Sequence, residues 1–514
     1  MPKLAPPGRN VGNCQPGSWT FHELPNSDQR TTCLDGSPYG FYYMAAVPNP
    51  RREPPSMRNN DSWLLNFEGG GWCFSPEDCA VRSEGRAGSS LHWEKSAISI
   101  GGVVNKCCFC TRFCRFHRVY LKSCDGHAFG GDAEFQVPPS SHWPLSRRPQ
   151  QGESEAAASA VTLRSNGRAI LRAVINVLVD RFGMREARHV LVAGCSAGGM
   201  AALLNAERIR AQLLALGVRP ARFKVASIAG VFFNVPAPSS ALSVAQSLVS
   251  PNQITNYLSP FEEQTRAMVT LGNVELPERC RSFAPVGSEW RCLLGLGLVE
   301  ALPEDLPAFI FQSRLDLWQT NCIFAAGRSR YFGLNCSQST PAWHRCLGWM
   351  QPLKAGGRCT PDQWAALRAY EESNGRALAS SAALRRDGYG SFTHSCFDHC
   401  ATTAGLIYTG ASLLPGLVND SVNLRESLFS WFLGGAPWPP RERDSSIVPP
   451  LVPAWNHTHM GCWNSPVSIM VPGKANEPGC RKPECGLPDK MHKDNTAAQR
   501  QRIRSRGWKW QLDE

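Results

Sequence analysis

The residues with the clearest chemical potential lie in "GCSAG" at positions 194–198, a G-x-S-x-G pattern centred on Ser196. Such a pattern presents a nucleophilic serine when a buried strand enters it and a helix leaves it, because small residues allow the sharp turn that exposes the hydroxyl. Residues 190–193 are a β-branched run typical of a buried strand, and the apolar residues after Met200 recur at helical spacing. This context predicts a nucleophile at Ser196 rather than a glycine-rich structural turn, which the pattern alone would allow.

A serine nucleophile requires a base and a carboxylate that orients the base. In α/β hydrolases the three residues follow one another along the chain as Ser, then Asp or Glu, then His. Asp316 directly follows an apolar run at residues 306–313 that is typical of a core strand. Two later histidines, His394 and His399, are candidates for the base. Spacing alone leaves each of them open, as the base or as a hydrogen-bonded structural residue.

The serine chemistry also needs backbone N–H groups that stabilise the negatively charged oxygen of the tetrahedral intermediate. One such donor normally belongs to the residue after the nucleophile, which is Ala197 here. A second normally comes from an early glycine-rich loop, and "EGGGW" at residues 68–72 has the expected position and composition. We therefore expect Gly70 and Gly71 to contribute donors, although an ordinary tight turn would have the same composition.

The elements that must position these residues alternate between strand and helix patterns. Strand patterns occupy residues 63–67, 190–193, 222–233 and 306–313, and residues 161–182 form an amphipathic helical pattern. This succession predicts an α/β fold with a mostly parallel sheet and helices on both faces. Residues 235–300 and 322–390 are expected to be long, irregular, Cys-bearing insertions above the sheet. We divide the chain into an N-terminal extension (1–29), a catalytic domain (30–440) and a basic tail rich in Pro and Cys (441–514).

The 21 cysteines indicate disulfide bonds, and therefore an oxidising compartment. A zinc site in "CCFCTRFC" at residues 107–114 is the alternative, but no second pair of cysteines lies nearby, as zinc knuckles require. We expect no metal site, a Cys73–Cys79 disulfide that staples the loop after residue 72, and a reduced Cys195 that acts as a small core residue. The first ten residues lack the apolar segment of a signal peptide.

The formal net charge of +12 favours anionic partners such as an acidic polysaccharide. A basic run at residues 499–510 is most simply a solvated tail. We expect no nucleic-acid partner, because base-stacking motifs are missing. The uncharged run at residues 190–206 is too short and too rich in glycine for a membrane span. The sequence therefore predicts a protein without an integral membrane segment, and we expect a monomer.

The motifs together are similar to those of the pectin acetylesterase family of plants, which has the lipid esterase Notum as an animal relative. The resemblance covers roughly residues 30–405 and rests on motifs that occur in the family's order: "CLDGSP" (33–38), "EGGGWC" (68–73), "GSS" (88–90), "CDGHAFGGD" (124–132), "GCSAGG" (194–199), "LPERC" (276–280), "DLWQ" (316–319) and "SCFDHC" (395–400). The resemblance implies an α/β-hydrolase-like fold. It also implies a triad of Ser196, Asp316 and His399, and so selects His399 over His394.

The same resemblance implies oxyanion donors at Gly70, Gly71 and Ala197, with Trp72 lining the acyl pocket or the loop beneath it. It implies a secreted or cell-wall serine carboxylesterase that needs no metal or organic cofactor. The motifs "GGGWC" and "DLWQ" are closer to the plant type than to Notum, which favours removal of O-acetyl groups from a pectin-like polysaccharide through an acyl-enzyme on Ser196. The alternatives are a Notum-like esterase that removes a lipid acyl group from a protein, and a non-catalytic carbohydrate-binding protein on the same scaffold. The three intact triad residues argue against the second alternative.

Overall fold

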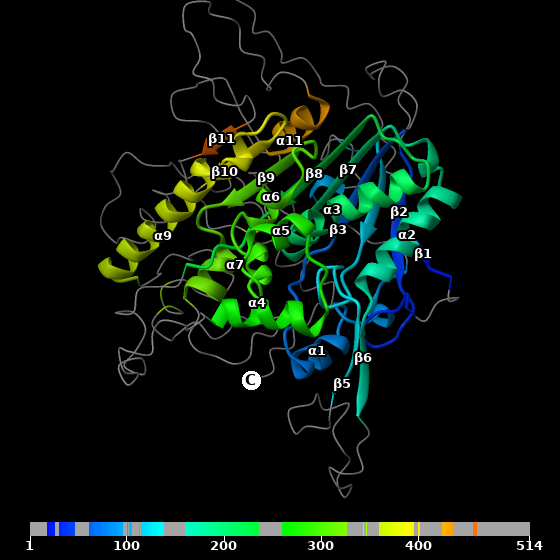
Figure 1. Ribbon diagram of the computed structural model, residues 1–514, viewed down its shortest axis with the longest axis horizontal. Helices are drawn as coiled ribbons and strands as arrows, with labels where there is room; N and C mark the ends of the chain where they lie inside the picture. Colours follow the sequence, from blue (N-terminus) through cyan, green and yellow to red (C-terminus); the bar gives the residue numbers. More distant parts are fainter. Residues whose placement is uncertain are drawn as a thin grey trace, which may run out of the picture.

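The computed structural model describes residues 18–25, 30–46, 61–95, 100, 102–104, 113, 115–137, 160–235, 260–325, 343, 346, 359–394, 399–400, 424–434 and 456–459. These residues form a central sheet covered by helices (Figure 1). The cysteine cluster at residues 107–114 and the basic run at residues 499–510 lie outside the described residues, apart from Phe113 within the former.

The described part of the chain contains one nine-stranded sheet. In spatial order its strands are β1 (Thr20–Glu23), β2 (Gly40–Met44), β4 (His117–Leu121), β3 (Ser62–Phe67), β7 (His189–Cys195), β8 (Arg222–Ile228), β9 (Ala308–Ser313), β10 (Gly390–His394) and β11 (Asn456–His459). All neighbours from β4 to β11 pair in parallel, whereas β1 and β2 form an antiparallel edge. A separate antiparallel ribbon pairs β5 (Ala133–Val137) with β6 (Val161–Ser165). The predicted mostly parallel sheet is confirmed.

The helices are distributed over both faces of this sheet. They are α1 (Pro76–Ser83), α2 (Gly167–Arg181), α3 (Ala197–Ala215), α4 (Pro260–Leu271), α5 (Glu278–Phe283), α6 (Gly297–Ala301), α7 (Leu317–Gln319), α9 (Pro361–Ser380) and α11 (Leu424–Leu433). Short helical turns are η2 (Ser90–His92), η3 (Gly102–Val104), η6 (Met184–Glu186), η10 (Glu289–Leu293), η11 (Thr320–Phe324) and η12 (Ala383–Arg385).

Side chains alternate across the strands and so build two cores. Leu65 and Val192 pack with α2, α3 and α6 on one face. Leu64 and Leu191, their chain neighbours, pack with α11 on the opposite face. Helices on both faces, as expected from the sequence, are therefore confirmed (Figure 1).

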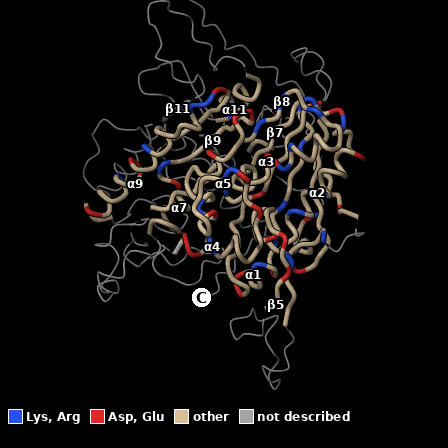
Figure 2. Tube along the Cα trace, viewed as in Figure 1, with Lys and Arg blue, Asp and Glu red and all other residues tan. Residues whose placement is uncertain are grey.

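Most charged residues of the described part of the chain lie at its surface, although a few, such as Arg118 and Asp125, are fully buried. Lysine and arginine are interspersed with aspartate and glutamate over the described helices and loops (Figure 2). The central strands β7 and β9 contain no Lys, Arg, Asp or Glu. In the described part of the chain, no helix is both long enough and apolar enough to cross a membrane.

Three sequence-based predictions of secondary structure were wrong, two of them in the boundary of an element. The predicted helix at residues 161–182 begins with β6, because Val161–Ser165 pair with β5 and α2 starts only at Gly167. The strand predicted at residues 222–233 ends at Ile228, where Ala229 takes a positive φ of 50°. The insertions predicted to be irregular contain helices α4, α5, α6 and α9. Helix α9 even carries a capping box between Thr360 and Gln363, a start signal that was readable in the sequence.

Disulfide bonds fasten the loops to this frame. The structure contains Cys33–Cys124, Cys73–Cys79, Cys195–Cys400, Cys280–Cys292 and Cys346–Cys359. The predicted bond between Cys73 and Cys79 is confirmed, with a Cα separation of 5.1 Å. Every cysteine in the described part of the chain is disulfide-bonded.

Candidate active site

Ser196 occupies a sharp turn between β7 and α3. Its backbone has φ 59° and ψ −131°, an unusual conformation for a residue with a side chain, and its N–H donates to the Ile228 carbonyl at 2.8 Å. The flanking glycines make room for this turn. A Cβ at Gly194 would lie 2.2 Å from the Gly198 oxygen, and one at Gly198 would lie 2.3 Å from the Phe67 oxygen. The glycines of the G-x-S-x-G pattern are therefore required by close backbone packing.

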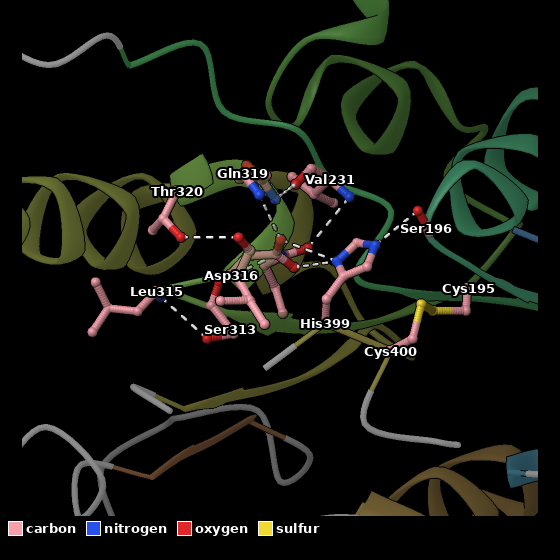
Figure 3. Close-up of polar contacts among 12 residues, drawn as sticks. Cys195, Ser196, Val231, Ser313, Leu315, Asp316, Gln319, Thr320, His399 and Cys400 are labelled. Atoms are coloured by element: carbon pink, nitrogen blue, oxygen red, sulfur yellow. Dashed lines mark hydrogen bonds and ion pairs between the residues drawn. A yellow bond between two sulfur atoms is a disulfide. The ribbon is translucent and has the colours of Figure 1, made fainter. Parts of the chain in front are cut away.

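His399 lies beside Ser196 although 203 residues separate them in the sequence. Its Nε2 is 2.8 Å from Ser196 Oγ, and its Nδ1 is 2.8 Å from Asp316 Oδ2 and 3.0 Å from Asp316 Oδ1 (Figure 3). These contacts fit an imidazole that accepts from the serine hydroxyl and donates to the carboxylate. His394 is instead the last residue of β10, where its ring packs 5.1 Å from that of Phe311. The structure brings together the three residues that the family resemblance implied.

Asp316 is held on both of its carboxylate oxygens. It caps α7 by accepting from the Gln319 N–H at 2.9 Å, and Gln312 Nε2 lies 3.4 Å from its second oxygen. The Gln319 side chain accepts from Phe233 N–H at 2.8 Å and donates to the Val231 carbonyl at 2.9 Å. Asp316 is only 1 % exposed, so the bonds that its carboxylate accepts from Gln319 N–H and Gln312 Nε2 compensate for the loss of water around it. Neither glutamine was predicted from the sequence, although Gln319 lies in the "DLWQ" motif.

The glycine loop after β3 approaches the serine turn closely. A Cβ at Gly69 would lie 2.7 Å from the Cys195 oxygen, and Gly70 and Gly71 have φ values of 132° and 70°. The N–H groups of Gly70, Gly71 and Ala197 donate no hydrogen bond to any residue that the structure describes. They are therefore available to a ligand at Ser196.

A buried guanidinium, that of Arg82, holds the same loop through two of its carbonyls. Arg82 of α1 is 5 % exposed and donates from Nη2 to the carbonyls of Gly70 at 2.9 Å and Trp72 at 3.3 Å. Burial lowers the pKa of Arg82, and the nearby carboxylates of Asp78 and Asp125 act against that shift. By binding the carbonyls on one side, Arg82 fixes the orientation of the loop peptides. A buried arginine gives no signal in the sequence, and this role of Arg82 was not predicted.

A pocket of about 340 Å³ opens in front of these groups. Its lining consists of Glu68, Gly69, Gly70, Gly71, Trp72, Phe74, Arg82, Ser196, Phe261, Gln264, Trp318, Cys322, His399 and Cys400. Aromatic rings form one side of the pocket. The ring centroid of Trp72 lies 5.2 Å from that of Phe232 and 6.2 Å from that of Phe261, and the centroids of Phe232 and Trp318 are 5.4 Å apart. The Trp318 ring also stacks on His399 at 6.2 Å. Trp72 lines the pocket, which is one of the two positions expected for it.

The expectation that Cys195 is reduced was wrong. Cys195 forms a disulfide with Cys400, whose Cα lies 5.7 Å away (Figure 3). The error has a physical reason, because Cys195 is not fully enclosed by the core. It ends β7 half-buried, at the edge where the residue after His399 arrives.

The described residues offer one group of side chains with metal-ligand chemistry, formed by Cys73, Cys79 and His127, whose ligand atoms lie within 4.8 Å of one another. The two sulfur atoms share a disulfide and so cannot act as thiolate ligands. Burial lowers the pKa of His127 to about 4, and its Nδ1 lies 2.7 Å from Ser165 Oγ. The cluster is therefore structural, and its Cys73 follows the glycine loop directly in the sequence.

Comparison with known proteins shows the family to which the chain is similar. The model of the pectinacetylesterase family matches residues 17–438. Pectin acetylesterase 5 of Arabidopsis thaliana is 24% identical over 409 residues, which cover 79% of this chain and 78% of that protein. Pectin acetylesterase 7 of the same plant is 24% identical over 82% of this chain and 89% of its own length. The palmitoleoyl-protein carboxylesterase NOTUM of Homo sapiens is 26% identical over 58% of this chain and 50% of its own length.

Proposed function

Because the chain belongs to the pectinacetylesterase family, it is a carboxylic ester hydrolase, and we propose that it acts through an acyl-enzyme on Ser196. The observation that carries this proposal is the continuous hydrogen-bonded chain from Ser196 Oγ through His399 to the Asp316 carboxylate. Serine is a weak nucleophile until a neighbouring base accepts its proton, and this geometry provides the base and the group that orients it.

In the proposed reaction, Ser196 Oγ attacks the ester carbonyl while His399 Nε2 takes the hydroxyl proton. Asp316 stabilises the resulting imidazolium through Nδ1 and remains ionised. The imidazolium then protonates the departing alcohol oxygen, which leaves the acyl group on Ser196. A water molecule, deprotonated by His399, attacks this ester and releases the carboxylic acid. These steps use protein side chains and water, and we assign no metal or organic cofactor to them.

We place the oxyanion hole at the backbone N–H groups of Gly70, Gly71 and Ala197. Their availability supports this assignment, as does the position of the glycine loop against the serine turn. Arg82 acts here as a positioning residue, because its bonds to the carbonyls of Gly70 and Trp72 fix the orientation of the loop peptides. Rigid placement matters, since donors that need not reorganise during the reaction stabilise the transition state most.

We propose that the acyl group is short, in agreement with removal of acetyl groups. The rings of Trp72, Phe261 and Trp318 line the pocket and contact one another or Phe232, so a long chain has to displace packed aromatic side chains. Glu68, a charged residue of the lining, is already bonded to Lys122 Nζ at 2.8 Å. An uncharged acyl group fits this lining.

For the alcohol portion we propose an acetylated polysaccharide of pectin type. Pectin acetylesterases 5 and 7 of Arabidopsis thaliana, which match along most of their length, support a carbohydrate ester. The carboxylesterase NOTUM, a palmitoleoyl-protein esterase by name, matches over only half of its length and supports the alternative of a lipid ester on a protein. Release of acetate from acetylated pectin, compared with release of fatty acid from an acylated peptide, distinguishes the two.

We further propose that the enzyme is a monomer, and that it works in the secretory lumen or outside the cell. Support for this compartment comes from the cysteines, because every one in the described part of the chain is disulfide-bonded. Disulfides persist in such oxidising compartments and are rare in the cytosol.

Acyl-chain preference gives a direct prediction. We expect the rate of hydrolysis of p-nitrophenyl esters to fall about 10- to 100-fold between acetyl and octanoyl, because additional methylenes overpack the ring cluster. Phe261→Ala, which removes one of the pocket rings, should reduce this fall severalfold. The ratio of octanoyl to acetyl kcat/KM is the appropriate measurement, since it does not depend on the fraction of active protein.

The matched control is Phe283→Ala, because Phe283 is a 53 % exposed ring outside the pocket lining. It should leave the ratio unchanged. An enzyme that cleaves octanoyl esters as fast as acetyl esters would contradict the short-acyl proposal and favour the lipid ester.

A further inference from the structure

We propose that the Cys195–Cys400 disulfide is a positioning element of the reaction, which holds the base against the nucleophile; this inference rests on the proposed function above. Cys195 immediately precedes Ser196, and Cys400 immediately follows His399 (Figure 3). The bond therefore joins the main chain on one side of the nucleophile to the main chain on one side of the base. Residues that lie 205 positions apart in the sequence become covalent neighbours at the site of proton transfer.

One end of this bond is anchored in the most rigid part of the fold. Cys195 is the last residue of β7, which lies between β3 and β8 in the centre of the sheet. It pairs with Ile228 in the parallel register, and the next N–H, that of Ser196, donates to the Ile228 carbonyl. A group attached to the Cys195 sulfur is therefore fixed relative to Ser196.

The other end of the disulfide, at His399 and Cys400, is held less by secondary structure than Ser196 and Asp316 are. Ser196 lies between β7 and α3, and Asp316 caps α7 just after β9. His399 and Cys400 belong to no helix or strand, and Cys400 has a φ of 61°, which residues with a side chain seldom adopt. Asp316 restrains the imidazole ring of His399, whereas the disulfide restrains its main chain. Together they keep Nε2 at 2.8 Å from Ser196 Oγ.

The disulfide is also accessible from the pocket, unlike most of the others. Cys400 lines the pocket, and both Cys195 and Cys400 are half-buried. Three of the other described disulfides, Cys33–Cys124, Cys73–Cys79 and Cys280–Cys292, have both cysteines no more than 3 % exposed. Cys322, the other disulfide-bonded cysteine of the pocket lining, is only 2 % exposed, so a small dithiol that enters the pocket should reduce Cys195–Cys400 first. In that exchange the dithiol is oxidised to its own disulfide, and Cys195 and Cys400 each gain one electron and one proton.

The consequence is a loss of catalysis in a folded enzyme. Without the bond, the chain at His399 gains freedom, and the fraction of time that Nε2 spends within reach of Ser196 Oγ decreases. A displacement of about 1 Å at a reacting group lowers rates by up to about 100-fold. We therefore expect kcat to decrease and KM to stay nearly constant, because the pocket rings of Trp72 and Phe261 and the donors of Gly70 and Gly71 are not covalently bonded to either cysteine.

The test compares the double variant Cys195→Ala/Cys400→Ala with a matched control, Cys280→Ala/Cys292→Ala, which removes a buried disulfide between α5 and η10. With p-nitrophenyl acetate, kcat of the first variant should fall about 10- to 100-fold with KM within about twofold. The control should keep both constants near the wild-type values. Cys195–Cys400 closes the longer loop, 205 residues against 12, so its removal costs more stability. The melting temperatures of both variants therefore have to be measured, to show that each is folded at the assay temperature.

Dithiothreitol treatment of the wild type gives a measurement that does not depend on folding of a variant. The treatment should lower the kcat of the wild type by the same factor, and reoxidation should restore it. The control variant should respond in the same way, whereas Cys195→Ala/Cys400→Ala should not respond. The rate at which a fluorophosphonate labels Ser196 should fall in parallel, because that reaction uses the same base. Wild-type kcat in the folded double variant would overturn the proposal, as would a reductant effect that persists in it. Failure of the proposed function is distinguishable, since it would appear as full activity of Ser196→Ala.

Discussion

Replacing Ser196 with alanine should lower kcat/KM for p-nitrophenyl acetate by about 10⁴-fold or more, close to the rate without an acyl-enzyme. The variant lacks the oxygen that forms the covalent intermediate, and a water molecule in its place lacks the fixed position of Ser196 Oγ. Residual turnover comes from the oxyanion donors and from substrate binding, which the substitution leaves in place.

The fold should survive this change. Ser196 makes no side-chain capping bond to α3, so alanine removes no structural hydrogen bond of that kind. Far-ultraviolet circular dichroism and the melting temperature should match those of the wild type. Ser282→Ala, a change at an exposed position on α5, is the control and should retain full activity. Most of the wild-type turnover in Ser196→Ala would show that another group is the nucleophile.

Replacing His399 with alanine should have an effect of similar size, about 10⁴-fold on kcat/KM, because the group that accepts the Ser196 proton is removed. The acid limb of the pH–rate profile, which reports protonation of the base, should disappear in the residual activity. The contact of 2.8 Å between His399 Nε2 and Ser196 Oγ is the basis for this expectation.

His394→Gln is the informative comparison, because both histidines fitted the order of residues along the chain. His394 is 1 % exposed in β10 and packs on Phe311, so its replacement should lower the free energy of unfolding. Activity per folded molecule should change by less than about tenfold, and the acid limb should remain. A loss of catalysis in His394→Gln together with an active His399→Ala would reverse the assignment of the base.

The parts of the site that could be predicted from the sequence are those that local patterns determine. A β-branched run, small residues and a helical pattern fix the turn at Ser196 within a few residues, and the structure has β7 and α3 on either side of it. Asp316 was found in the same way, as the first carboxylate after the apolar run that forms β9. Parallel strands then bring both residues to one edge of the sheet.

Features that depend on contacts between distant segments could not be predicted. The choice of His399 over His394 came from the family resemblance, since spacing alone fitted both. The partner of Cys195 lies 205 residues away, and periodicity contains no information about such a pairing. Residues 161–165 form β6 because they pair with β5, although their sequence also suits the helix that follows. Arg82 is buried against two loop carbonyls, a position that its residue type disfavours on average.

The proposal that the reaction passes through an acyl-enzyme on Ser196 can be tested most directly by mass spectrometry of enzyme quenched in acid during turnover of p-nitrophenyl acetate. We predict a mass increase of about 42 Da, one acetyl group, on the peptide that contains Ser196. The increase should be absent from Ser196→Ala treated in the same way. Acetylation of a different residue that forms and decays at the rate of turnover, with Ser196 unmodified throughout, would contradict the assignment.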